Sequence, residues 1–127
     1  MKIQNEETIW GLVDAKKEAF IKLADRVFDT PETLYKEFQS VKEHIFTLES
    51  EGFKITEDIC GMPTAVIGEA GGEGPIIAIL GEFDALPGLS QEPGIAEYKP
   101  ITEGGDGHGC GHNLLGAAAL LAATAVK

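Results

Sequence analysis

The segment Gly107-His108-Gly109-Cys110-Gly111-His112-Asn113 carries the side chains best suited to hold a metal ion in this chain. Residues two positions apart point to the same side of an extended backbone, so Cys110 and His112 could reach one ion, with His108 close enough to contribute or support. Thiolate and imidazole both suit zinc and other first-row divalent metals. A helix that opens at Asn113 would place its positive end beside the site and favour a thiolate on Cys110. The motif therefore predicts a metal site.

Two other interpretations of this segment remain open. A glycine-rich sequence with one cysteine and two histidines is also typical of a flexible loop. Alternatively, Cys110 could be a redox-active or nucleophilic thiol, although the absence of a Cys-x-x-Cys pair argues against the redox version.

A second candidate cluster is Glu82-Phe83-Asp84, which follows the apolar run at residues 76–80. In open α/β sheets, ligands bind just beyond the carboxyl ends of the strands, which is where this cluster would lie. Asp84 could orient a metal-bound histidine as a supporting carboxylate. The alternative is a solvated turn punctuated by Pro87-Gly88, and the pattern alone does not decide between the two.

Two helices are predicted to precede these motifs. The first spans about residues 6 to 28 and has apolar residues at helical spacing, namely Ile9, Val13, Phe20, Leu23 and Val27. The second begins with Thr30 as N-cap, Pro31 at the first helical position and Glu32 at the positive end of the helix dipole. Its apolar face consists of Leu34, Phe38, Val41, Ile45 and Leu48, and Gly52 ends it.

Three strands and a third helix should follow. The strands are expected at 53–56, 64–67 and 76–80, the last one apolar on both faces like a central strand covered by helices. A long loop at 89–111 leads to a helix at 114–127 capped by Asn113. This helix is still apolar at its last residues, which suggests that the polypeptide continues. The fold class is therefore α/β, with helices packed on a mixed sheet that missing strands would complete.

Several residues receive no chemical role. The aromatic residues at helical spacing are expected in the core, namely Trp10, Phe20, Phe28 and Phe38. His44 lies between charged residues of the second helix and is expected at the surface. Cys60 is interpreted as a small apolar residue near the end of a strand.

The composition excludes several functional classes. A chain of 127 residues with 43% apolar and 24% charged residues is typical of one globular domain. Phosphate backbones and anionic membranes would repel the net charge of -11, so neither nucleic acid nor a membrane is an expected partner. No apolar run is long enough to cross a bilayer, and the first seven residues lack the pattern of a secretory signal. A cytoplasmic location follows, and two cysteines fit a reducing compartment, although one Cys60–Cys110 disulfide is compatible with the sequence.

The sequences Gly-Glu-Phe-Asp-Ala-Leu-Pro-Gly at 81–88 and Gly-His-Gly-Cys-Gly-His-Asn at 107–113 together resemble the M20 family of metallopeptidases and amidohydrolases. Within this family, the match is to the branch that uses a Cys-Gly-His metal motif. The insertion with Leu89-Ser90-Gln91, and Thr30-Pro31-Glu32, are similar to the group of p-aminobenzoyl-glutamate hydrolase B subunits. The likeness runs over nearly the whole chain and is specific mainly from Gly81 onward.

The resemblance implies that Cys110 and His112 are metal ligands and that Asp84 is the active-site aspartate that supports and orients the metal centre. Three further residues are candidates for a supporting role: His108, Glu82 and Asn113. Where many relatives have aspartate, this chain has the uncharged Asn113 and the longer Glu82.

The activity that the resemblance implies is hydrolysis of an amide in an N-acyl amino acid, with p-aminobenzoyl-glutamate as the favoured substrate. Two zinc or manganese ions per complete site would activate a water, and a glutamate from a Glu-Glu pair would act as general base. That pair, the remaining ligands and a dimerisation domain would lie beyond residue 127. Residues 1–127 are therefore expected to be the N-terminal portion of the catalytic domain and inactive alone, with a homodimer or a partner subunit in the full-length protein.

Two rival functions belong to other classes. A truncated relative could bind metal or a partner without turnover. A thiol enzyme could use Cys110 as its nucleophile, and its activity would then be insensitive to chelators.

Overall fold

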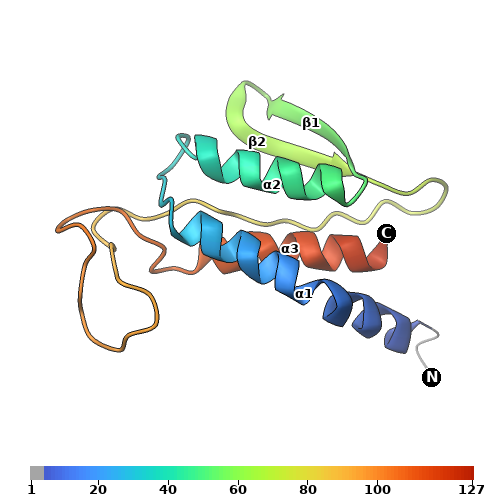
Figure 1. Cartoon of the computed structure of the whole chain (residues 1–127). Coiled ribbons are helices and arrows are strands. Elements are labelled where there is room, and N and C mark those ends of the chain that lie inside the picture. The colour runs from blue at the N-terminus through green and yellow to red at the C-terminus, as the bar shows by residue number, and fades with distance from the viewer. Residues whose placement is uncertain (1–4) are drawn as a thin grey trace.

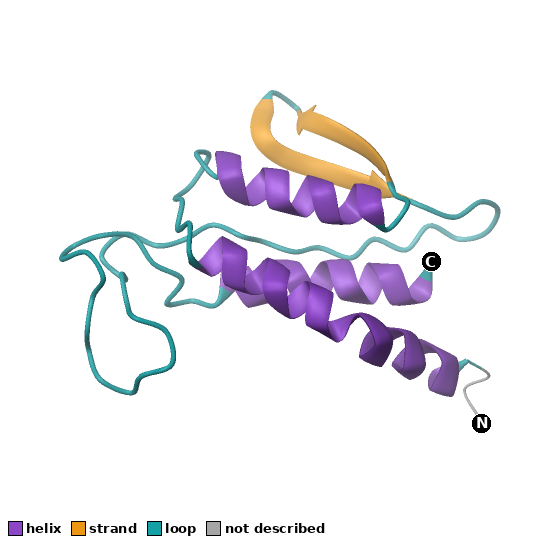
Figure 2. Ribbon diagram, viewed as in Figure 1, coloured by secondary structure: helices purple, strands orange, loops and turns teal. Residues whose placement is uncertain are grey.

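A computed structural model describes residues 5–127. Residues 1–4, which belong to the opening segment without a secretory-signal pattern, lie outside the described residues. The elements are three helices and one β-hairpin: α1 (Glu6–Phe28), α2 (Phe38–Ser50), β1 (Lys54–Ile59), β2 (Met62–Glu69) and α3 (His112–Val126). Helices α1 and α3 lie side by side, and α2 separates this pair from the hairpin (Figure 1). The expected fold class, helices packed with a β-sheet, is confirmed, and the strands of its sheet pair antiparallel (Figure 2).

The bounds predicted for the first helix agree with α1, but only its second half is in the core. Phe20, Leu23, Ala24 and Val27 are buried and pack against Ala117 of α3. The first apolar residues of this stripe, Ile9 and Val13, are only half-buried. The first turns of α1 extend past the C-terminal end of α3 (Figure 1).

Two of the four aromatic residues expected in the core are exposed. Phe20 is buried as expected and Phe28 is half-buried, whereas the exposed fractions of Trp10 and Phe38 are 62% and 48%. Helical spacing indicates which face is apolar but does not say whether another element reaches that face.

The predicted start of the second helix is wrong, because α2 begins at Phe38. The hydroxyl of Thr30 donates to the carbonyl of Arg26 in the last turn of α1 instead of capping a new helix. Glu32 is nevertheless a cap: its carboxylate accepts hydrogen bonds from the backbone N–H groups of Gln39 and Ser40 at 2.8 to 3.0 Å. A side chain seven residues away therefore satisfies the free N–H groups of the first turn of α2.

The first two predicted strands, at 53–56 and 64–67, are present as β1 and β2 but are longer than predicted, and α2 ends where expected. Gly52 has a φ of 80° after the last turn of α2, as expected of the residue that ends a helix. In the hairpin Ile59 pairs with Met62, so Cys60 and Gly61 form a two-residue turn with φ values of 55° and 76°. Cys60 directly follows the last residue of β1, near the end of a strand as expected, and its side chain is exposed at this turn. Both cysteines are free.

The predicted central strand at residues 76–80 is not observed. The chain here is extended, but no strand within residues 5–127 pairs with it, so its backbone lacks a sheet ladder. Ile76 and Leu80 have exposed fractions of 98% and 83%. Figure 1 shows this segment (yellow) passing between α2 and the α1–α3 pair. An apolar run predicts burial, but a strand also requires neighbouring strands to pair with.

We expect the exposed apolar segment at 76–80 to make the isolated chain self-associate. Exposed apolar patches on unpaired extended backbone favour association between copies. Sedimentation velocity should show a concentration-dependent increase in mass, and the double variant Ile76→Lys/Leu80→Lys should remain monomeric. The control is Ile21→Lys, a change of an exposed isoleucine on α1 that should not alter association. Identical sedimentation of all three proteins would contradict the prediction.

None of the helices described within residues 5–127 combines the length and the apolar character needed to cross a bilayer.

Candidate metal centre

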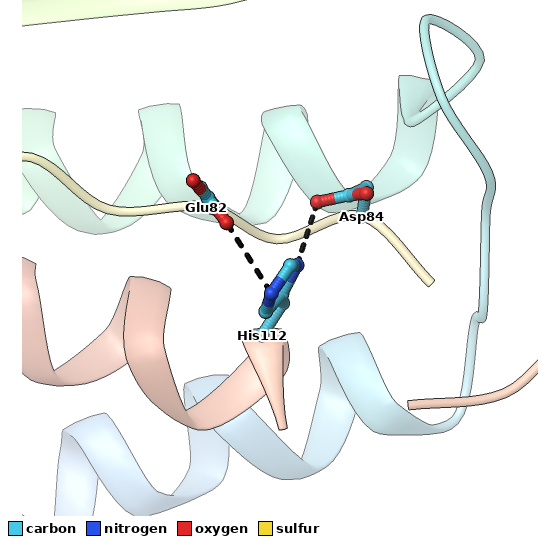
Figure 3. Close-up of side chains that lie close together, drawn as sticks. All are labelled: Glu82, Asp84 and His112. Carbon is cyan, nitrogen blue, oxygen red and sulfur yellow. Dashed lines mark hydrogen bonds and ion pairs between the residues drawn. The ribbon is translucent and has the colours of Figure 1, made fainter. Parts of the chain in front are cut away.

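Three side chains from two distant segments meet at one end of α3. Glu82 and Asp84 lie on the extended segment after Gly81, and His112 is the first residue of α3 (Figure 3). Asp84 Oδ1 lies 2.7 Å from Nδ1 of His112, and Glu82 Oε2 lies 3.2 Å from Nε2 of the same ring. Each nitrogen of the imidazole therefore faces a different carboxylate.

The backbone after Asp84 is held from two sides. The N–H of Ala85 donates to the carbonyl of Glu32 at 2.7 Å, and Thr33 forms a parallel bridge with Ala85. Leu86 and Gly107 exchange two backbone hydrogen bonds of 3.0 Å. The loop between α1 and α2 therefore anchors one carboxylate segment, while the bridge to Gly107 brings it beside the metal motif.

The segment 107–113 is hydrogen-bonded to the end of α1. His108 Nε2 donates to the carbonyl of Val27 at 3.1 Å, and the buried Asn113 side chain donates to the carbonyl of Ala24 at 3.2 Å. The expected capping role of Asn113 is therefore wrong: the N-cap of α3 is Gly111, whose φ is 78°. The amide is used in a contact between helices, which local sequence does not reveal.

The ring of His108 faces the end of α1: Nε2 donates to Val27, and the ring centroid lies 6.3 Å from that of Phe28. The side chain is buried, and burial lowers the pKa of its imidazole, opposed in part by the hydrogen bond to Val27. Because Nε2 carries the proton donated to that carbonyl, Nδ1 of the neutral ring is a lone-pair acceptor, and it has no hydrogen-bond partner.

Cys110 lies outside the cluster. Among residues 5–127, the group of side chains whose potential ligand atoms lie within 4.8 Å of one another consists of Glu82, Asp84 and His112. Cys110 is exposed and is separated from His112 by Gly111, a residue with the positive φ that glycine adopts readily. Its role as a ligand remains a prediction.

The expected surface position of His44 is wrong, because its exposed fraction is 1%. Nδ1 donates to the carbonyl of Ser40 at 2.8 Å, and the ring packs on Phe83 with centroids 4.4 Å apart. Val41, His44 and Leu48 are all buried and recur at steps of three and four, which is the signal that could have placed this histidine on the inner face. The charged residues that precede His44 in the sequence, Lys42 and Glu43, led to the wrong prediction of a surface position.

We expect the stability of the chain to fall as the pH drops below about 6.5, the ordinary pKa of histidine. Burial lowers the pKa of His44, opposed in part by the Ser40 carbonyl and the Glu43 carboxylate. As the pH falls below about 6.5, His44 therefore binds a proton in the unfolded chain. In the folded chain it stays neutral until the pH reaches its lower folded pKa. The slope for one such group is at most about 1.4 kcal/mol per pH unit.

Urea unfolding at about pH 7.5, 6.5 and 5.5 measures this slope. In the variant His44→Leu the slope should decrease, and the remainder should include the contribution of His108, whose pKa burial also lowers. A slope that is the same with and without His44 would show that its protonation is not linked to folding.

The chemistry of the donor set fits a divalent cation. When Nδ1–H of His112 donates to Asp84, the lone pair on Nε2 faces the Glu82 carboxylate, and two acceptors repel unless a proton or a cation lies between them. Two ligand atoms in a tetrahedral shell at about 2.1 Å from zinc are about 3.4 Å apart, close to the 3.2 Å between Nε2 and Oε2. Glu82 and Asp84 also supply two negative charges.

Comparison with known proteins confirms the resemblance that the motifs indicated. The chain is 47% identical over 115 residues to the B subunit of p-aminobenzoyl-glutamate hydrolase from Escherichia coli (strain K12), covering 91% of the chain and 24% of that protein. It is 35% identical over 108 residues to Thermostable carboxypeptidase 2 of Saccharolobus solfataricus, covering 80% of the chain and 26% of the relative. The chain thus spans about a quarter of the length of these relatives, which are hydrolases by name. No family model matches it.

Proposed function

We propose that residues 1–127 are the N-terminal portion of the catalytic domain of an M20-type metallo-amidohydrolase. The reaction would be hydrolysis of the amide bond in an N-acyl amino acid, with p-aminobenzoyl-glutamate as the favoured substrate. The observation that carries the proposal is the imidazole of His112 held between the carboxylates of Asp84 and Glu82. The name of the relative from Escherichia coli supports the choice of substrate.

Each residue of the chain has a distinct part in this site. Asp84 accepts the Nδ1 proton of His112, which fixes the tautomer and turns Nε2 toward the cation. Nε2 and the Glu82 carboxylate are the first two ligand groups. The thiolate of Cys110 would be a third, and the glycine between it and His112 gives the backbone conformational freedom there.

Zinc or manganese, two ions in a complete site, would polarise the scissile carbonyl and lower the pKa of a bound water. Thiolate ligation favours zinc, and carboxylate ligation suits manganese. The chain's own contribution is the orientation of His112 and two negative charges that concentrate cations at the end of α3.

The isolated chain should not hydrolyse the substrate. In the resembled family a glutamate from a Glu-Glu pair is the general base, and residues 113–127 contain no such pair. We therefore place the general base and the remaining ligands in further polypeptide, with a second copy or a partner subunit completing the assembly. The Escherichia coli relative is by its name one subunit of a hydrolase, which fits a partner subunit, and we propose a cytoplasmic location.

A segment exchange tests this function directly. The matching region of the Escherichia coli hydrolase would be replaced by this chain, and release of p-aminobenzoate would be measured. We expect activity that a chelator removes and a divalent metal restores. The same chimaera with His112→Ala should be inactive, while an exchange carrying Glu92→Gln, an exposed carboxylate far along the loop, should retain activity.

The same chimaera separates the rival functions. Cys110 is exposed and free, so a thiol nucleophile remains chemically reasonable. Activity that resists chelators but is lost on alkylation of Cys110 would favour the thiol enzyme. A folded chimaera that binds metal without any turnover would favour a non-catalytic binding module.

A further inference from the structure

Helix α3 contacts the carboxylate-bearing segment backbone to backbone. A Cβ atom added at Gly81 would lie 2.8 Å from Cβ of Ala119 and 3.2 Å from Cα of Gly116. A Cβ atom added at Gly116 would lie 2.8 Å from the carbonyl oxygen of Glu82. No side chain therefore fits between α3 and residues 81–82.

The imidazole of His44 closes this contact from the side of α2. A Cβ atom at Gly116 would lie 2.6 Å from Nε2 of His44, which is buried and has no hydrogen-bond partner. The ring cannot turn away freely, because Nδ1 donates to Ser40 and one face packs on Phe83. The space at Gly116 is thus bounded by a backbone carbonyl and by a ring held in place.

Gly116 is placed so that a side chain at this position would shift His112. It lies four residues after His112, so both residues are on the same face of α3, one turn apart. A methyl group at position 116 would have to move from 2.6 and 2.8 Å to at least 3.4 Å, a displacement of about 0.6 to 0.8 Å. Ligand geometry tolerates about 0.2 Å, so such a displacement would disturb the spacing between His112 and the carboxylates.

We propose that Gly116 and His44 are positioning residues, which set the distance between α3 and residues 81–84 and thereby hold His112 against Asp84 and Glu82. The ligand in question is the divalent cation of the proposed function, on which the inference rests.

The variant Gly116→Ala tests the proposal, with Gly11→Ala as its matched control. Both changes add one methyl group inside a helix, but a Cβ atom at Gly11 meets nothing within 4 Å. The first readout uses the metal-free chain: the downfield proton NMR signal of His112 Nδ1–H, identified by its loss in His112→Ala. We expect this signal in the parent and in Gly11→Ala, and its loss or strong broadening in Gly116→Ala.

The second readout is titration with Co²⁺, followed by its visible absorption, under conditions where circular dichroism shows each protein folded. We expect Gly116→Ala to bind Co²⁺ at least about tenfold more weakly than the parent, as for other disturbances of groups that support metal ligands. His44→Ala alone should also bind Co²⁺ more weakly than the parent, because it removes the ring that bounds this contact on the side of α2. Gly11→Ala should bind like the parent.

Unchanged Nδ1–H signal and Co²⁺ affinity in folded Gly116→Ala would overturn the proposal. If this variant does not fold, Gly81→Ala is the alternative, because it adds a methyl group to the same contact from the side of residues 81–82. Adding Ala119→Gly then removes the methyl group of α3 that the new one would meet. Loss in the single variant and recovery in the double variant would support the proposal, and no loss would overturn it. A parent that shows the Nδ1–H signal but binds no Co²⁺ would refute the metal site while leaving the positioning of His112 to be decided by the NMR result.

Discussion

Replacing His112 by alanine should weaken binding of Zn²⁺ or Mn²⁺ to the chain by more than about 100-fold, since loss of a supporting partner alone costs about 10- to 100-fold. His112 contributes the nitrogen ligand and carries both carboxylate contacts, at 2.7 and 3.2 Å. Its loss leaves Glu82 and Asp84 as two carboxylates that repel each other without a cationic or donor group between them. Metal content after purification and isothermal titration both measure the effect.

Three further variants measure how much individual side chains contribute to metal affinity. Asp84→Asn keeps the shape of the side chain but exchanges the proton acceptor for an amide, so we expect a loss of about 10- to 100-fold. Cys110→Ala should lower affinity only if the thiolate closes onto the ion, which makes it the direct test of that predicted ligand. Glu92→Gln, which removes an exposed carboxylate paired with Lys99, is the control for charge and should bind like the parent. Equal metal content in the parent and His112→Ala would refute the site.

Replacing Leu23 by alanine should lower the free energy of unfolding by about 3 kcal/mol. Leu23 has an exposed fraction of 0% and lies at the contact between α1 and α3. Removing its side chain loses transfer free energy and leaves a cavity that neighbouring helices fill only in part. A small domain has a total stability of about 5 to 15 kcal/mol, so this loss is a large fraction of the total, above all at the lower end of that range. Urea unfolding followed by circular dichroism gives the value.

The matched control is Ile21→Ala on the same helix. Ile21 is an aliphatic residue of similar size with an exposed fraction of 51%, so its loss should cost less than about 1 kcal/mol. Similar costs for the two variants would mean that α1 does not pack on α3 through Leu23. Because Ala24 and Val27 beside it accept the hydrogen bonds of Asn113 and His108, the Leu23 variant should also bind metal more weakly.

Local sequence was sufficient for the features that depend on local periodicity or on one residue's backbone preference. The apolar repeat predicted the bounds of α1, and Gly52 predicted the end of α2. The residue types of Glu82, Asp84 and His112 already indicated a cation, because imidazole and carboxylate groups are metal ligands in any fold. These features require no knowledge of what packs against them.

Only the tertiary structure decided which groups meet. The cap of α2 comes from Glu32 rather than Thr30, the amide of Asn113 bonds α1 rather than its own helix, and His44 is buried beside Phe83. The pairing of His112 with Asp84 joins residues 28 positions apart. Each of these contacts competes with a local alternative, and packing of whole helices selects among them. The spacing of apolar residues predicts which face of a helix is apolar. Which element covers that face is decided by the tertiary packing of the helices and strands.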